Sequence, residues 1–112
     1  MTDSACIPPS GFERPDTDTL ELTRVLHALS DPVRLNIVRQ LACQGAMACR
    51  AAAGPDVPKA TLSRHFKTLR TAGVVETTKD ASGQYTSRIR TDCLEERFPG
   101  LLASVLASAD AA

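Results

Sequence analysis

A chain of 112 residues, 43% of them hydrophobic and 23% charged, suits one domain with a real core. The sequence holds no run of about eighteen apolar residues and no basic leader before a hydrophobic block, so we expect a cytoplasmic protein without membrane association. The formal net charge is zero, but residues 59–90 carry seven basic and two acidic side chains. Phosphate attraction is local, being screened over roughly 8 Å at physiological salt, so this segment still favours a nucleic-acid partner.

The start of the chain divides into an arm and a first helix. Residues 1–16 contain three prolines and a glycine but few spaced apolar residues, which predicts a flexible arm ahead of one domain over residues 17–112. Asp18 and Glu21 form a capping-box pattern, and apolar residues then recur at helical spacing. The first helix is therefore predicted over residues 19–29.

A second helix is predicted from Pro32 to about Ala42. Asp31 can accept hydrogen bonds from its free amides, proline suits its first position, and Gly45 ends it. Cys43, at the end of this helix, is predicted to be a small core residue because free cysteine is commonly buried. The four cysteines form no Cys-x-x-Cys pair and follow no secretory signal, so a disulfide scaffold is not expected.

Two further helices are predicted with a turn between them. Residues 46–53 favour a short helix by composition, and residues 54–56, Gly-Pro-Asp, break it. The next helix covers residues 58–73, with proline in its first turn and Gly73 at its end. This order is helix, turn, helix.

The helix over residues 58–73 has one narrow apolar edge and one broad cationic face. Leu62, Phe66 and Leu69 fall within about 60° of one another on a helical wheel, which predicts an anchoring stripe. The residues that point away from the stripe are Ala60, Ser63, Arg64 and Lys67. Charge, hydroxyls and a small residue form a set that can meet phosphates and base edges, as expected of a helix that lies against DNA.

A β-hairpin and two helical segments complete the chain. Residues 74–79 and 84–90 are rich in Val, Thr, Tyr and Ile, with a turn sequence between them. Asp92 is predicted to cap a short helical turn that Pro99 and Gly100 interrupt. The terminal helix then carries an apolar seam of Leu101, Leu102, Val105 and Leu106. The seam serves either as a dimer interface or to close the core of one protomer.

The order of these elements is the layout of a winged helix-turn-helix domain, mainly α-helical with a β-hairpin. Residues 25–35 (Val-Leu-His-Ala-Leu-Ser-Asp-Pro-Val-Arg-Leu), 61–67 (Thr-Leu-Ser-Arg-His-Phe-Lys) and 69–74 (Leu-Arg-x-Ala-Gly-Val) closely resemble the ArsR/SmtB family of bacterial transcriptional repressors. The resemblance covers about residues 19–107. It implies a homodimer, built through the first and last helices, that binds an inverted-repeat operator in double-stranded DNA and leaves when a signal arrives.

The resemblance also implies which residues contact DNA. It puts five residues in or beside the major groove, namely Lys59, Thr61, Ser63, Arg64 and His65, and it puts Arg88 near the minor-groove contact of the wing. Arg64 can be bidentate to guanine, whereas Lys67 is expected to hold the backbone as a point charge. His65 lies at the edge of the apolar stripe, so a packed histidine remains the alternative.

The sequence departs from the family pattern at the positions that sense the inducing signal in related repressors. Metal-sensing members often carry a Cys-x-Cys pair on the short helix before the recognition helix, and that pair falls on Met47 and Cys49 here. No histidine lies on the last helix, so a zinc sensor of that kind is disfavoured. Three signals remain: arsenite or another thiophilic ion held by Cys6 with Cys49 or Cys93 across a dimer, oxidation of a cysteine pair, or an organic ligand, a partner protein or none. No cofactor is required.

Two other classes of function are alternatives to a DNA-binding regulator. An enzyme would need Cys49 or Cys93 as nucleophile and His27 or His65 as base, but the chain offers no orienting group, phosphate loop or catalytic motif. We therefore expect no catalytic activity. The second class is a winged-helix protein-interaction module without DNA binding, which the acidic ends of the chain make conceivable.

Overall fold

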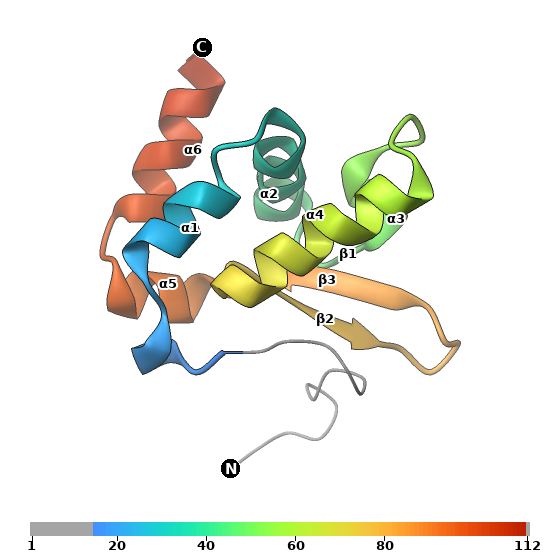
Figure 1. The fold of residues 1–112 in the computed structure, drawn as a ribbon, viewed down its shortest axis with the longest axis horizontal. Coiled ribbons are helices and arrows are strands. Elements are labelled where there is room, and N and C mark those ends of the chain that lie inside the picture. The colour runs from blue at the N-terminus through green and yellow to red at the C-terminus, as the bar shows by residue number, and fades with distance from the viewer. Residues whose placement is uncertain (1–14, 112) are drawn as a thin grey trace.

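The computed structural model describes residues 15–111, so nearly all of the predicted N-terminal arm, with Cys6, lies outside the described residues. The fold is mainly α-helical with a small sheet, as predicted (Figure 1). In chain order its elements are η2 (Thr17–Thr19), α1 (Leu22–Ala28), α2 (Pro32–Gln44), β1 (Met47–Ala48), α3 (Cys49–Ala53), α4 (Lys59–Ala72), β2 (Val75–Lys79), β3 (Tyr85–Ile89), α5 (Thr91–Arg97) and α6 (Leu101–Ala111). None of these described helices combines the length and the apolar content needed to cross a membrane.

The sheet has three antiparallel strands in the order β1-β3-β2. β2 and β3 form the predicted hairpin, in which Glu76 lies opposite Arg88. β1 begins at Met47 and pairs with β3, so the helix predicted over residues 46–53 is wrong at its start and holds only over Cys49–Ala53. The alanine-rich composition favours helix locally, but β3 offers an open edge whose backbone groups gain partners from these residues.

The core lies where α4 packs against α1, α2 and the sheet (Figure 1). Phe66, Leu69 and Ala72 of α4 are buried and Leu62 is half-buried, so the predicted apolar stripe is confirmed. Buried residues of the other elements complete this core: Val25, Ala28, Ile37, Val38, Leu41, Val75 and Leu94. Burying one such large side chain is worth about 1.5–3 kcal/mol, so the stripe decides which face of α4 turns outward.

The ends of α2 and α4 follow the predicted signals. The Asp31 carboxylate accepts the amides of Val33 and Arg34 at 2.9 and 3.1 Å, which caps α2. Gly45 ends α2 at a φ of 80°, and Gly73 ends α4 in the left-handed conformation. Both helices therefore have well-defined limits.

The predicted capping box before α1 is wrong. Asp18 lies in the 3-10 turn η2, and the backbone then runs extended through Leu20, whose side chain is buried. α1 begins at Leu22, and Glu21 stands at its N-cap without a side-chain capping bond. Burial of Leu20 against Gly73 places the chain here and outweighs the local capping preference.

Two predictions near the ends of α2 and α5 are also wrong. Arg90, not Asp92, occupies the N-cap of α5, and Asp92 lies in the first turn of the helix. There its negative charge still favours the positive end of the helix dipole. Cys43 is exposed, because the last turn of α2 turns Leu41 and not Cys43 into the core.

Replacing Gly73 by alanine is expected to destabilise the fold by about 2–4 kcal/mol. Gly73 has a φ of 86°, which costs an L-residue about 1–2 kcal/mol, and an added Cβ would collide with the buried Leu20 side chain. Gly100→Ala is the matched control, since Gly100 has a φ of 79° but no heavy atom near the added Cβ. Urea unfolding should show the larger loss at Gly73; equal losses would show that the Leu20 contact contributes nothing.

Candidate nucleic-acid interface

The outward face of α4 carries most of the predicted DNA-binding side chains. Lys59, Ser63, Arg64 and Lys67 are exposed, and Thr61 is half-buried. The Arg64 guanidinium has no hydrogen-bond or ion-pair partner within the described part of the chain. Packing of the opposite, apolar edge on the core therefore leaves a cationic, hydroxyl-bearing surface available to a ligand.

His65 turns away from that surface. Its side chain is only 14% exposed, its Nδ1 lies 3.3 Å from Nη1 of Arg34, and its Nε2 lies 3.9 Å from the Asp31 carboxylate. Since Arg34 can only donate, the contact at Nδ1 requires a lone pair there and leaves the ring proton on Nε2, toward Asp31. Arg34 also donates to the carbonyls of Ala28 and His27 at 2.8 and 3.2 Å. His65 thus joins α4 to the start of α2.

The turn before α4 is held by Arg50 of α3. Its guanidinium donates to the carbonyl of Gly54 at 3.1 Å and to that of Val57 at 2.6 Å. These bonds span the loop whose last residue, Pro58, is the N-cap of α4. A charged donor satisfies loop carbonyls that would otherwise need water, so the entry into α4 is fixed.

The tip of the β2-β3 hairpin is a well-ordered turn beside an exposed cation. The Asp80 carboxylate accepts the Ser82 hydroxyl at 2.6 Å and the Gln84 amide at 2.9 Å, and these bonds lower the pKa of Asp80. Lys79 lies over the ring of Tyr85, 5.5 Å from its centroid. The wing therefore presents an amine supported by an aromatic face.

Arg88 has a partner inside the protein. Its Nε forms a hydrogen-bonded ion pair with the carboxylate of Glu76, which lies opposite it on β2. The Glu76 side chain is 2% exposed and that of Arg88 is 58% exposed. Arg88 thus neutralises a buried carboxylate, while most of its own side chain remains in solvent.

The thiols lie among hydroxyl and guanidinium groups. Cys49 Sγ lies 3.2 Å from the Ser87 hydroxyl, which lies 2.6 Å from that of Thr77. Burial raises the pKa of the Cys49 thiol, although the bond with Ser87 partly offsets this effect. Cys93 Sγ accepts a bond from Arg90 at 3.6 Å. Residues 15–111 hold no group of three His, Cys, Asp or Glu side chains placed to bind a metal.

Comparison with known proteins places these features in a family. Residues 29–78, from the end of α1 to β2, match the family model described as a helix-turn-helix domain. The chain is 38% identical over 84 residues to the uncharacterized HTH-type transcriptional regulator YceK of Bacillus subtilis (strain 168), over 73% of this chain and 83% of that relative. This chain belongs to the helix-turn-helix transcriptional regulators.

A solved structure supports the same assignment. The regulator resembles the transcriptional repressor BigR from Xylella fastidiosa with a TM-score of 0.54 and 27% identity, over 69% of this chain and 85% of that chain. The winged helix-turn-helix fold predicted from the sequence is thereby confirmed, and the regulator is a DNA-binding protein. α3 and α4 form the helix-turn-helix, and the β2-β3 hairpin forms the wing (Figure 1).

Some residues of the candidate interface are not indicated by the sequence. Lys79 and Tyr85 meet only because the hairpin register places them opposite each other. Arg50 could not be recognised as a loop clamp, because its partners are backbone carbonyls that carry no side-chain signature. For Lys79, the sequence does offer an indication, which is the position of this cation directly before the hairpin turn.

Replacing Asp31 by alanine removes the cap of α2 and is expected to lower the free energy of unfolding by about 1 kcal/mol. The Arg34 amide lowers the pKa of Asp31 from its ordinary value of 3.8, burial opposes this effect, and the Val33 amide lowers the pKa further. A lowered pKa adds stability that is present above the unfolded-state pKa and is lost as the pH falls through the folded-state value.

Asp31→Asn keeps an accepting oxygen but removes the titrating charge, and so isolates this pH dependence. Urea unfolding at fixed protein concentration should show wild type more stable than Asp31→Asn at pH 7, with the difference shrinking as the pH falls below about 4. A difference that is the same at pH 7 and pH 3 would contradict the assignment.

Proposed function

We propose that this regulator is a homodimeric repressor of the ArsR/SmtB type, which binds an inverted-repeat operator in double-stranded DNA and is released by a signal. The observation that carries the proposal is the outward face of α4, where exposed cations and hydroxyls stand on a helix anchored by its apolar edge. The sequence motifs at residues 25–35 and 61–74 support membership of this family. The similarity to a transcriptional repressor supports repression rather than activation.

The side chains of α4 are proposed to contact two parts of the DNA, the base edges and the phosphates. Ser63 and Arg64 read base edges, where an arginine can be bidentate to guanine, while Lys59 and Lys67 hold phosphates. Thr61, being half-buried, contacts the backbone at the edge of the groove. Two-fold symmetry would place the two half-sites about one helical turn of DNA apart.

Two predicted contacts take different roles in this proposal. His65 positions α4 through Asp31 and Arg34, because only 14% of its side chain is exposed. Arg88, whose side chain is 58% exposed, remains a predicted contact of the wing with the DNA backbone. Lys79, at the tip of the hairpin, is a second candidate for the wing contact.

Changing Arg64 and Lys67 together to alanine is expected to weaken DNA binding by roughly ten- to a hundredfold and to reduce the salt dependence by about one phosphate contact, that of Lys67. Fluorescence anisotropy with duplex DNA from upstream of the coding region, over a range of salt concentrations, measures both effects. Arg39→Ala, which removes one cation of α2, is the control for net charge and should leave affinity within about twofold.

The same experiment distinguishes a DNA-binding repressor from a protein-interaction module. A protein-interaction module without DNA binding would show no salt-dependent affinity for the duplex in the wild type. Unchanged affinity in the double variant, with binding intact in the wild type, would mean that α4 is not the reading helix.

The dimer is proposed to form through α1 and α6. Leu22 and Leu26, one turn apart on α1, are 46% and 43% exposed, which is unusual for large apolar side chains of a stable monomer. The seam of α6 is only half-buried in the protomer: Leu101, Leu102, Val105 and Leu106. Both helices leave apolar surface that a second copy of the chain would cover.

Replacing Leu26 by glutamate is expected to convert the dimer into monomers, because a carboxylate would have to be desolvated at the interface. Light scattering coupled to size-exclusion chromatography gives the mass directly. Tyr85→Glu is the matched control: Tyr85 is also 43% exposed but lies on the wing, so this variant should stay dimeric. A dimeric Leu26→Glu variant would place the interface elsewhere.

The inducing signal is left as three alternatives. A thiophilic ion such as arsenite would need Cys6 together with Cys49 or Cys93, and burial keeps the Cys49 thiol protonated, which disfavours metal binding. Oxidation of a cysteine pair needs two of these thiols to meet in the dimer. An organic ligand or a partner protein needs neither. For all three we propose a cytoplasmic regulator without catalytic activity.

A further inference from the structure

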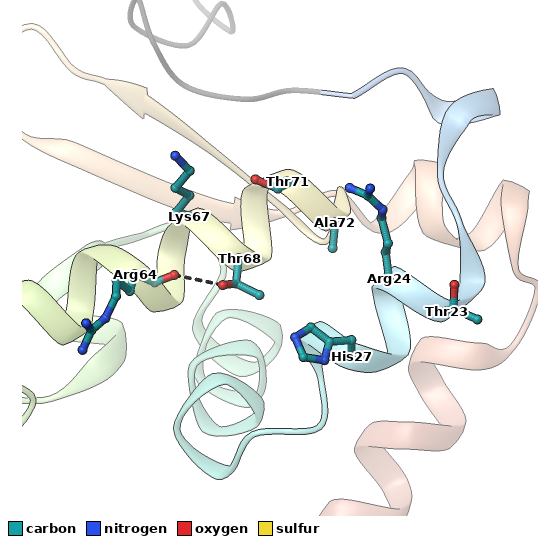
Figure 2. A pocket seen from close by; sticks show the side chains of 8 residues that line it. All are labelled: Thr23, Arg24, His27, Arg64, Lys67, Thr68, Thr71 and Ala72. Atoms are coloured by element: carbon teal, nitrogen blue, oxygen red, sulfur yellow. Dashed lines mark hydrogen bonds between the residues drawn. The ribbon is translucent and has the colours of Figure 1, made fainter.

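A groove of about 560 Å³ runs between α1 and α4 on the outer side of the recognition helix (Figure 2). α1 contributes Thr23, Arg24 and His27 to its lining. α4 contributes two cations, Arg64 and Lys67, together with threonine hydroxyls. The groove therefore joins the proposed recognition face to α1, a helix of the proposed dimer interface.

The charges of this groove suit an anion. Its lining holds two guanidinium groups and an amine but no carboxylate. The acid next to it is Glu21, whose carboxylate lies 3.1 Å from Nε of Arg24. Both of these side chains are 63% exposed, so water screens the pair and a phosphate can replace Glu21 as the partner of Arg24.

The groove also lies where a DNA backbone would pass. On the helical wheel, Arg64, Lys67 and Thr71 are opposite the buried Phe66 and Leu69, so the groove opens on the same side as the recognition face. In Figure 2, Arg24 and Lys67 extend toward the same side of the groove from its two walls. A helix seated in the major groove has a phosphate backbone along each flank, and α1 forms one flank of α4.

We propose that this groove seats a stretch of the DNA sugar-phosphate backbone beside the major groove, with Arg24 and Thr23 of α1 and Lys67 of α4 as its contacts. The inference rests on the proposed function of α4 and adds α1 as a second DNA-binding element. It is compatible with the proposed dimer, because Leu22 and Leu26 lie on the opposite side of α1 from Arg24.

The test is Arg24→Ala in the full chain, compared with Arg24→Lys and Arg39→Ala. Affinity is measured by fluorescence anisotropy over a range of salt concentrations, with the upstream duplex and with a scrambled duplex of equal length. Arg24→Ala should weaken both complexes by roughly three- to tenfold and lower the slope of log affinity against log salt by about one. Arg24→Lys should keep most of the affinity because a point charge suffices for phosphate.

Several results would overturn the inference. Unchanged affinity and salt slope in Arg24→Ala would exclude the DNA backbone and leave the groove to a free anion or to nothing. An equal loss of DNA affinity in Arg39→Ala would mean that the effect of Arg24→Ala comes from net charge alone. A loss of affinity for only one of the two duplexes would mean that Arg24 contacts bases. Failure of the wild type to bind either duplex would overturn the proposed function itself. Retained folding of the exposed Arg24 variants is checked by circular dichroism.

Discussion

Burial of the apolar edge of α4 is the constraint on which the proposed DNA-binding surface depends. Phe66 and Leu69 enter the core at 2% and 0% exposure, and Gly73 ends the helix where Leu20 closes over it. Once these residues are buried, the rotation of α4 about its axis is fixed, and Ser63, Arg64 and Lys67 must face outward. The cationic surface is thus a consequence of hydrophobic packing on the other side of the same helix.

Polar contacts then refine that position. Asp31 both caps α2 and faces the His65 ring of α4, while Arg34 joins the same ring to the carbonyls at the end of α1. One small network therefore links three helices at the point where they meet. Its members come from two separated sequence motifs, residues 25–35 and residues 61–67.

Much of this architecture could be predicted from the sequence, and three of the errors share one physical origin. The stripe of α4, the cap at Asp31 and the end at Gly73 are local features, and all three are confirmed. The strand at Met47 and the displaced start of α1 are set by distant partners, β3 and Gly73, and a local pattern does not report them. The same holds for His65, whose inward position follows from groups thirty residues earlier in the chain.

The two short elements before α4 connect the start of this helix to the wing. β1 pairs with β3 of the wing at Met47, the next residues form α3, and Arg50 of α3 holds the loop that opens into α4. This connection is a strap of about a dozen residues between the inner strand of the wing and the start of the recognition helix. The strap ties the wing to the start of α4, while Gly73 links the end of α4 to β2, so the angle between helix and wing is constrained at both ends of the helix.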